Sequence, residues 1–266
     1  MKIGIVGCGG RMGRMLVRAV AATDGAELAG GTEAKGSPLV GADPYQLAGL
    51  DPSGLALIDD AKALFEISDV VIDFTVPAAT AMHAELAAET GTALIPGTTG
   101  LSNDQQAKID AASKKVAVVQ AANYSVGVNL LLGLTEQTAA ILGDDYDIEV
   151  LEMHHRHKVD APSGTALALG KAAAAGRNVD LDDVSQRVRD GHTGERKRGD
   201  IGFATLRGGM VVGDHSVIFA ADEERIELTH IAADRAVFAK GAVRAALWTE
   251  DQAPGLYSMR DVLGFS

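Results

Sequence analysis

The chain has 266 residues, a length that suggests one large domain or two modest ones. Its formal net charge of -12 argues against a nucleic-acid-binding protein, because little would balance the repulsion from phosphates over a broad surface. The single cysteine, Cys8, excludes an intrachain disulfide and fits a reducing compartment. The first residues enter a strand pattern directly and no apolar run approaches membrane length, so we expect no signal peptide, no membrane contact and a cytoplasmic protein.

Short apolar runs alternate with helical patterns through the first half of the chain. Strands are predicted at residues 2–6, 26–31, 69–74, 93–95 and 116–120, and helices at 78–89, at 102–114 and from the end of the turn at residue 13 to about residue 22. The run at 69–74 is almost entirely apolar, as expected for a parallel strand that is buried on both faces. This alternation predicts an α/β fold with a doubly wound, Rossmann-like parallel sheet.

A glycine-rich turn, residues 7–13, separates the first predicted strand from the first helix. Glycines here let the backbone approach a pyrophosphate at the helix N-terminus. The spacing departs from the usual fingerprint, because Met12 stands where the third glycine is expected and the glycine comes at Gly13. Glu33 follows about 20 residues later, at the end of the second strand, where an acid binds ribose hydroxyls. We therefore predict dinucleotide binding rather than a merely structural turn, and we interpret Cys8 as a small filler.

Two further loops follow predicted parallel strands at their carboxyl ends: Gly97-Thr98-Thr99 and Ala121–Tyr124. Ligands bind at this edge of such sheets. We predict that both loops line the nicotinamide end of the cofactor. Ordinary connections between strands and helices are nearly as good an interpretation of the spacing alone.

After Asn129 the character of the chain changes. Three strand-like runs separated by short turns predict an antiparallel or mixed sheet, and hence a second domain of the α+β type, for which we expect the mixed form. The predicted elements are helix 130–142, strand 148–153, helix 165–175, a polar glycine-rich stretch at 189–200, strands 201–207, 211–220 and 225–231, and a final helix at 235–249.

A basic cluster, residues 154–158, contains three histidines, an arginine and a lysine in five consecutive positions. Like charges this close repel one another, which costs folding energy unless an anion binds among them. Histidine can also exchange protons near neutral pH. Ser163-Gly164-Thr165 comes just before an apolar helical run and resembles a helix start, where backbone N–H groups bind carboxylates. The segment therefore predicts a site that holds and protonates a small anionic molecule.

His154 and Lys158 would share one face of a strand or of a helix, so we predict that they act together. A solvated basic turn is the first alternative. A metal site is the second, and we disfavour it because there is no paired cysteine and Arg156 and Lys158 would repel a divalent cation. We expect Arg156 and His157 to be structural, in contact with Glu152 or Asp160.

Several segments together resemble the dihydrodipicolinate reductase (4-hydroxy-tetrahydrodipicolinate reductase) family. The resemblance covers essentially the whole chain, and the run His-His-Arg-His-Lys-Val-Asp-Ala-Pro-Ser-Gly-Thr is highly specific. It implies NAD(P)H-dependent reduction of 4-hydroxy-tetrahydrodipicolinate, a cyclic dicarboxylate, in diaminopimelate and lysine biosynthesis, by a homotetramer. The segments are 7–13, 97–100, 123–129, 152–165 and 191–196.

The resemblance also implies the roles of the two domains and of individual residues. Residues 1–125 and 234–266 would form the dinucleotide-binding domain, and residues 126–233 the domain for substrate binding and tetramerisation. The first histidine of the run, His154, would be the proton donor or acceptor, and Lys158 the proton donor. Substrate would be bound by His155, Gly164 and Thr165.

The cofactor would be NADH, NADPH or both. Some family members carry an arginine directly after the acid that matches Glu33, suited to a 2′-phosphate, whereas this chain has Ala34 and then Lys35. The cofactor contacts implied by the resemblance are Gly7, Cys8, Gly9, Gly10, Arg11, Met12, Glu33, Gly97, Thr98, Thr99, Ala121, Ala122, Asn123 and Tyr124.

Two other functions remain open on the residues alone. The first is another two-domain NAD(P)-dependent dehydrogenase of amino-acid metabolism, which would not need a site for two carboxylates. The second is a non-enzymatic dinucleotide-sensing protein. The acidic balance and the absence of a basic helix argue against a DNA-binding form of such a sensor.

Overall fold

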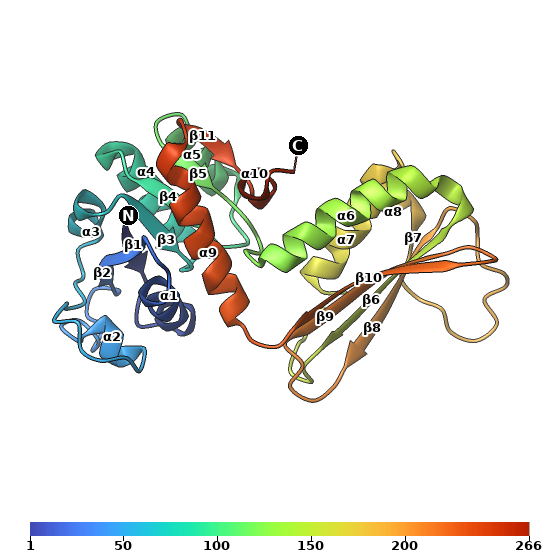
Figure 1. Ribbon diagram of the computed structural model, residues 1–266, viewed down its shortest axis with the longest axis horizontal. Helices are drawn as coiled ribbons and strands as arrows, with labels where there is room; N and C mark the ends of the chain where they lie inside the picture. The colour runs from blue at the N-terminus through green and yellow to red at the C-terminus, as the bar shows by residue number, and fades with distance from the viewer. Residues whose placement is uncertain (266) are drawn as a thin grey trace. The chain divides into compact units, whose positions relative to one another are not determined.

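The computed structural model describes residues 1–265. The chain divides into two compact units, Met1–Val126 with Ala236–Ser266, and Gly127–Arg235. Within the described residues, the first unit contains a six-stranded sheet and the second a five-stranded sheet (Figure 1). The predicted fold class, a Rossmann-like α/β sheet followed by a second, mixed sheet, is confirmed.

The sheet of the first unit is parallel throughout, in the order β11-β5-β4-β3-β1-β2. The predicted strands all form, and the edge strand β11 was not predicted, because three residues are too short to show a period. The strands are β1 (Lys2–Val6), β2 (Glu27–Thr32), β3 (Val70–Asp73), β4 (Ala93–Pro96), β5 (Ala117–Val119) and β11 (Gly255–Tyr257).

Helices cover both faces of this sheet, as a doubly wound fold requires (Figure 1). Successive strand residues point to opposite faces, so Ile72 of β3 joins the core with α1 and α9, and Val71 joins the core with α3, α4 and α5. The short helices α2, α3 and α10 were not predicted. The helices are α1 (Arg11–Ala21), α2 (Pro44–Leu47), α3 (Ala61–Ile67), α4 (Pro77–Thr90), α5 (Asn103–Ser113), α9 (Ala236–Trp248) and α10 (Met259–Leu263).

The second unit has a mixed sheet in the order β10-β9-β6-β8-β7, with β6 parallel to β8 and antiparallel to β9. Alternate residues of β6 are buried, and α7 packs on that face. The elements are α6 (Val126–Leu142), β6 (Asp147–His154), α7 (Gly164–Gly176), α8 (Leu181–Val184), β7 (Ser185–Gln186), β8 (Ile201–Arg207), β9 (Gly213–Ala220) and β10 (Arg225–Ala232).

The helix α6 differs from its prediction in two ways. It begins at Val126 rather than at residue 130. Together with the following turn it forms a 20-residue segment, Val126–Asp145, which is long and apolar enough to cross a membrane by length and composition alone. The expectation that no apolar run approaches membrane length is therefore wrong for this segment. One such helix is weak evidence of a span, since a core helix of a soluble protein passes the same test, and 33% of its most apolar window is buried, including Leu131 and Ala139.

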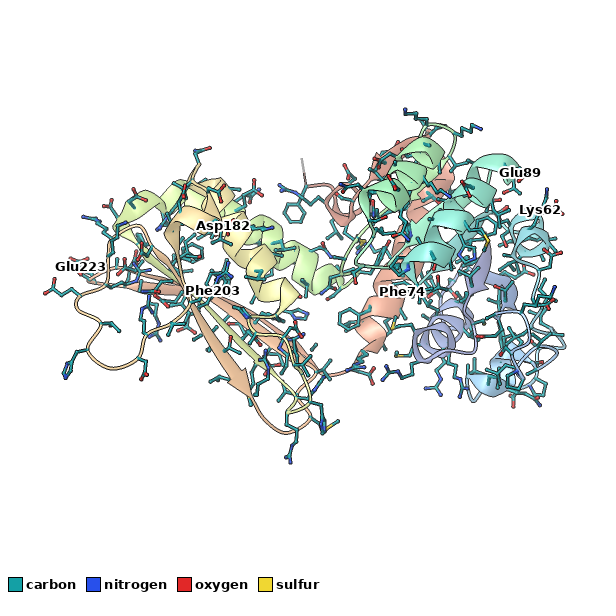
Figure 2. All side chains as sticks on the ribbon, turned by 180° about the vertical axis from the view of Figure 1, so that it is seen from behind. Lys62, Phe74, Glu89, Asp182, Phe203 and Glu223 are labelled. Atoms are coloured by element: carbon teal, nitrogen blue, oxygen red, sulfur yellow. The ribbon has the colours of Figure 1, made fainter. Side chains whose placement is uncertain are left out.

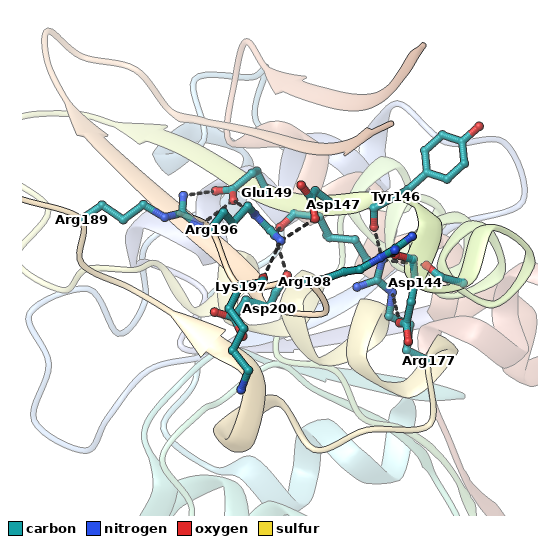
Figure 3. A network of polar contacts seen from close by, with 12 residues as sticks. Asp144, Tyr146, Asp147, Glu149, Arg177, Arg189, Arg196, Lys197, Arg198 and Asp200 are labelled. Atoms are coloured by element: carbon teal, nitrogen blue, oxygen red, sulfur yellow. Dashed lines mark hydrogen bonds and ion pairs between the residues drawn. The ribbon is translucent and has the colours of Figure 1, made fainter. Parts of the chain in front are cut away.

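Arginines attach the polar stretch around residues 187–200 to the start of β6 (Figure 3). Arg189 donates two hydrogen bonds to the Glu149 carboxylate, at 2.7 and 2.8 Å. Arg196 binds Glu149 and Asp147 together. These anchors lie at the opposite end of β6 from His154, so the arginines have a structural role within this unit.

Candidate functional site

The register of the mixed sheet brings four polar side chains together at the end of β6. Glu152 lies opposite His215 of β9, and His154 lies opposite Arg207 of β8. Directly opposed residues point to the same face of a sheet. Farther back along β6, that face carries apolar core residues, so the cluster forms where the core ends.

Glu152 is the centre of this cluster, and its side chain is 1% exposed. Its carboxylate accepts two hydrogen bonds from Arg207, at 2.8 and 2.9 Å, and one from the Ser163 N–H at 3.0 Å. The His154 Nδ1 lies 2.6 Å from the same carboxylate. Burial raises the pKa of Glu152, but Arg207, His154 and the Ser163 N–H outweigh it, and the net pKa is lowered. Glu152 thus remains a carboxylate that fixes the His154 ring through Nδ1.

The His215 ring packs edge-on against the His154 ring, with ring centroids 5.0 Å apart. Its Nε2 is 3.1 Å from the Ser163 Oγ. Burial is the main cause that lowers the pKa of His215 to about 4, and the nearby His154 imidazole and Lys158 ammonium act in the same direction. His215 is therefore neutral at physiological pH and can occupy the cluster without adding charge.

The basic cluster after His154 is a turn, which corrects the prediction of a shared strand or helix face. β6 ends at His154, and the Lys158 N–H then bonds to the His155 carbonyl. Lys158 makes an ion pair with Asp160 at 2.9 Å. The ion pairs of these carboxylates also differ from the expectation for Arg156 and His157, because among the described residues Arg207 pairs with Glu152 and Lys158 pairs with Asp160.

Two further groups belong to this region of the second unit: His155, at the start of the turn, and the N-terminus of α7. Desolvation and the nearby Arg235 guanidinium lower the pKa of His155. Ser163 caps α7, as predicted, by accepting a hydrogen bond from the Ala166 N–H at 3.1 Å. Gly164 is exposed, with no other atom near the position that a side chain would occupy. The N–H groups of Gly164 and Thr165 therefore lie at the start of a 13-residue helix, in a position suited to an anion.

In the first unit, the backbone of the glycine-rich turn requires glycine at two positions. Gly7 has a φ of 64°, and a Cβ on Gly13 would lie 2.3 Å from the Cys8 carbonyl oxygen, so only glycine allows α1 to pack this closely. Gly13 thus takes the packing role of the displaced third glycine. The N-cap residue of α1 is Gly10, so no side chain bonds to the first N–H groups of this helix. These N–H groups are therefore in a position suited to a phosphate.

Glu33 contacts this turn directly. The Gly9 N–H donates a hydrogen bond to the Glu33 Oε1 at 2.7 Å, and Ala34 and Lys35 follow as exposed residues. The Cys8 side chain is buried, and burial together with Glu33 raises the pKa of its thiol to about 12. This supports a filling role for the Cys8 side chain and leaves only its backbone for a cofactor.

The other two predicted cofactor loops leave the same carboxyl edge of the sheet, after β4 and β5. Thr99 and Ala122 are exposed, whereas Thr98 is buried and accepts a hydrogen bond from Thr80 at 2.7 Å. The Tyr124 hydroxyl lies within hydrogen-bonding distance of the Pro96 and Val119 carbonyls, at 2.9 and 2.6 Å. The buried Tyr124 ring therefore joins the two loops, and only its backbone remains for a ligand.

The predicted residues thus form two groups, one in each unit. The glycine-rich turn, Glu33 and the loops after β4 and β5 lie at one sheet edge. His154, His155, Lys158 and the start of α7 surround the end of β6. Sequence reasoning missed Arg207 and His215, whose only signal was a polar residue in a predicted strand. Within residues 1–265, no three His, Cys, Asp or Glu side chains are arranged to hold a metal ion.

The chain matches two family descriptions that together cover nearly its whole length. Residues 1–124 match "Dihydrodipicolinate reductase, N-terminus", and residues 127–263 match "Dihydrodipicolinate reductase, C-terminus". The 4-hydroxy-tetrahydrodipicolinate reductase of Parvibaculum lavamentivorans is 56% identical over 265 residues, covering 99% of this chain and 98% of the relative. That of Agrobacterium fabrum is 53% identical over 267 residues, covering 100% of this chain and 97% of the relative.

Solved structures share the fold at low sequence identity. Dihydrodipicolinate reductase from Paenisporosarcina sp. TG-14, a structure with dipicolinate bound, gives a TM-score of 0.77 at 22% identity and covers 97% of both chains. A probable dehydrogenase from Thermotoga maritima gives a TM-score of 0.61 at 12% identity, covering 98% of this chain and 92% of that one.

Proposed function

Since the chain belongs to the dihydrodipicolinate reductase family and is a reductase of 4-hydroxy-tetrahydrodipicolinate, we propose that the cluster at the end of β6 is its substrate and proton-transfer site. The observation that carries this proposal is the buried Glu152 carboxylate, which holds the His154 ring through Nδ1 and also accepts a hydrogen bond from the Ser163 N–H at the start of α7. The enzyme belongs to the diaminopimelate and lysine pathway and uses NAD(P)H.

The substrate is a cyclic dicarboxylate, so the site must neutralise two negative charges. We assign this role to Lys158 and His155 together with the N–H groups of Gly164 and Thr165. A lysine ammonium and the amides at a helix start both bind carboxylates well. The relative from Paenisporosarcina, whose structure contains dipicolinate, supports this choice of ligand.

The reduction also requires a proton. Hydride addition to the unsaturated ring gives an electron-rich centre that must be protonated, and elimination of the hydroxyl as water needs an acid as well. Lys158 is the proposed proton donor and His154 the proposed donor or acceptor. Glu152 supports His154 by holding Nδ1, which leaves Nε2 directed away from the carboxylate.

We assign cofactor binding to the carboxyl edge of the parallel sheet. The nicotinamide supplies the hydride when it is bound. The turn at residues 7–12 would hold the pyrophosphate, and Glu33 the adenosine ribose. The loops 97–99 and 121–124 would line the nicotinamide end. The tight packing of Gly13 and the uncapped start of α1 fit a dinucleotide in this turn.

The domain roles follow from these assignments. Residues 1–125 with 234–266 would bind the dinucleotide, and residues 126–233 would bind substrate and form a homotetramer in the cytoplasm. One face of the second sheet supports the tetramer, because large apolar side chains such as Leu206 and Ile231 are 48% and 69% exposed there. Native mass spectrometry tests this: a monomer at micromolar concentration would contradict it.

Enzyme assays test the proposed site. The purified chain should oxidise NADH or NADPH only when 4-hydroxy-tetrahydrodipicolinate is present, and dipicolinate should compete with that substrate.

A substitution at the start of α7 tests the amide donors. Replacing Gly164 with proline removes one amide donor, and proline is still tolerated at the start of a helix. We expect the KM for the substrate to rise about tenfold, with the affinity for NADH unchanged. Wild-type affinity for dipicolinate in Gly164→Pro would exclude this amide from the site.

A further inference from the structure

We propose that a buried pair, Asp73 and His83, is a positioning device for the dinucleotide site. Asp73 is the last residue of β3, at the carboxyl edge of the parallel sheet, and His83 lies in α4. Both are buried, at 0% and 5% exposed, and the His83 Nδ1 is 2.8 Å from the Asp73 Oδ2. The proposal rests on the assignment of this sheet edge to the cofactor.

Asp73 fixes the backbone just after β3. Its Oδ1 accepts hydrogen bonds from the Thr75 N–H at 2.8 Å and from the Thr75 hydroxyl at 2.6 Å. Burial raises the pKa of Asp73, but His83 and Thr75 outweigh it and the net pKa is lowered. A buried carboxylate without such partners would be costly, so the turn at Phe74-Thr75 is held in the one arrangement that satisfies Asp73.

The residues of this turn contact all three parts of the proposed cofactor site. The Thr75 methyl group lies 3.0 Å from the position that a Cβ on Gly7 would occupy, in the glycine-rich turn. The Phe74 ring, labelled in Figure 2, fills the space beside Gly97, where a Cβ would lie 2.4 Å from it. The same ring packs on Tyr124, with centroids 5.4 Å apart.

A second connection runs through the start of α4. The Thr80 hydroxyl, which is fully buried, donates to the Thr98 hydroxyl at 2.7 Å. Thr80 is one helical turn before His83, so the pairing of His83 with Asp73 also fixes where Thr80 meets the loop after β4. His83 is itself held by stacking on Phe65, with ring centroids 5.9 Å apart. Two contacts therefore transmit the position of α4 to the cofactor loops, and they are linked to each other, because the Thr75 and Thr80 hydroxyls lie 3.5 Å apart.

This arrangement assigns Asp73 and His83 a role in nucleotide affinity rather than in proton transfer. Their side chains are enclosed by the core between the sheet and α4, so they act through Phe74, Thr75 and Thr80. Loss of the pair should raise the dissociation constant for NADH and its KM. At saturating NADH, kcat should change little, because the substrate cluster is in the other unit.

The test compares two buried threonines: Thr80 of α4, which bonds to the loop after β4, and Thr92, which lies just before β4. Thr80→Val removes the hydroxyl that bonds to Thr98, after β4. Thr92→Val removes an equally buried hydroxyl before β4, which donates to the Phe65 carbonyl at 2.9 Å. Fluorescence titration should give an NADH dissociation constant about threefold higher for Thr80→Val, and within about twofold of wild type for the Thr92→Val control. The midpoint temperature of thermal unfolding should fall by a similar amount in both variants.

The same titration applies to the pair itself. Asp73→Ala should raise the NADH dissociation constant about tenfold or more, whereas Asp73→Asn, which still accepts from Thr75, should remain within about threefold. Wild-type affinity in both Asp73→Ala and Thr80→Val, with wild-type protein binding NADH normally, would overturn the positioning role alone. Failure of the wild-type chain to bind either NADH or NADPH would overturn the cofactor assignment and this inference together.

Discussion

Each unit contains a buried carboxylate bonded to a histidine Nδ1, and the two pairs differ in their other partners. The Asp73 carboxylate also accepts hydrogen bonds from Thr75, whose N–H and hydroxyl are neutral donors. The Glu152 carboxylate instead accepts them from the charged Arg207 guanidinium and from a backbone N–H. The histidine–carboxylate distances are similar, at 2.8 Å for His83 and 2.6 Å for His154. The pairs are therefore distinguished by what surrounds them rather than by their own geometry.

The difference supports the roles proposed above for the two pairs. The buried His83 ring stacks on Phe65 inside a core, so His83 is enclosed by the protein. His154 borders a turn that carries Lys158 and His155, and it lies beside the neutral His215. A carboxylate with an arginine partner stays ionised even when the adjacent histidine changes its protonation, which suits a histidine that exchanges protons with a substrate.

The largest expected effect is on turnover at the end of β6. His154→Ala and Lys158→Ala should each lower turnover about a hundredfold or more, the usual scale for losing a general acid. NADH binding should remain almost unchanged, because the glycine-rich turn is in the other unit. Steady-state kinetics combined with NADH titration measure both. Collapse of NADH affinity while bound substrate still turned over would show that the catalytic assignment is wrong.

The next prediction compares how much the carboxylates of Glu152 and Asp73 each contribute to the free energy of unfolding. Glu152→Gln leaves Arg207 without its countercharge in a largely buried place, so we expect a loss of about 3 kcal/mol in the free energy of unfolding. Asp73→Asn keeps an acceptor for Thr75 and can donate to His83, and should cost only about 1 kcal/mol. Urea unfolding monitored by circular dichroism gives both values. Equal losses would mean that Arg207 adds nothing to the Glu152 pair.

A third effect concerns pH. The pKa of His215 falls from 6.5 to about 4 on folding, so between these values the unfolded chain binds more protons than the folded one. Stability from this group is therefore present at high pH and is lost as pH falls, by about 2 kcal/mol between about pH 7.5 and pH 5. His215→Gln should flatten this slope in urea unfolding. The exposed His192→Gln serves as the control and should keep the wild-type slope, and a flat slope in wild type would contradict the prediction.

The smallest effect concerns the third carboxylate, Glu33, which is half-buried and accepts one hydrogen bond, from Gly9. An acid here binds ribose hydroxyls and repels a 2′-phosphate, although Lys35 and Arg11 could offset part of that repulsion. We expect both cofactors to work, with NADH at least as good as NADPH and better by up to about tenfold, or about 1.4 kcal/mol. Ala34→Arg should move the ratio of kcat/KM values toward NADPH. A wild-type enzyme that strongly prefers NADPH would refute this interpretation of Glu33.

The sequence by itself determined the fold class and the family. Alternating apolar runs and helical periods are local properties, so they predicted the parallel sheet, the mixed sheet and most of the helices. The run from residue 152 to 165 identified the family, because so many chemically distinct residues rarely recur in one order. Short elements such as β11, α2 and α10 were missed because three to five residues do not complete a recognisable period.

Only the tertiary structure decided which side chains meet. Arg207 and His215 are more than fifty residues from Glu152 and reach it through the register of three strands, which depends on the packing of the whole sheet. The end of β6 at His154 likewise follows from the turn contacts of His155 and Arg156 with the segment before β9, so the strand period could not be extended to Lys158. Asp73 and His83 appeared in sequence as one more polar residue on a strand and one on a helix. Their pairing depends on how α4 packs on the sheet, a long-range contact that local periodicity does not encode.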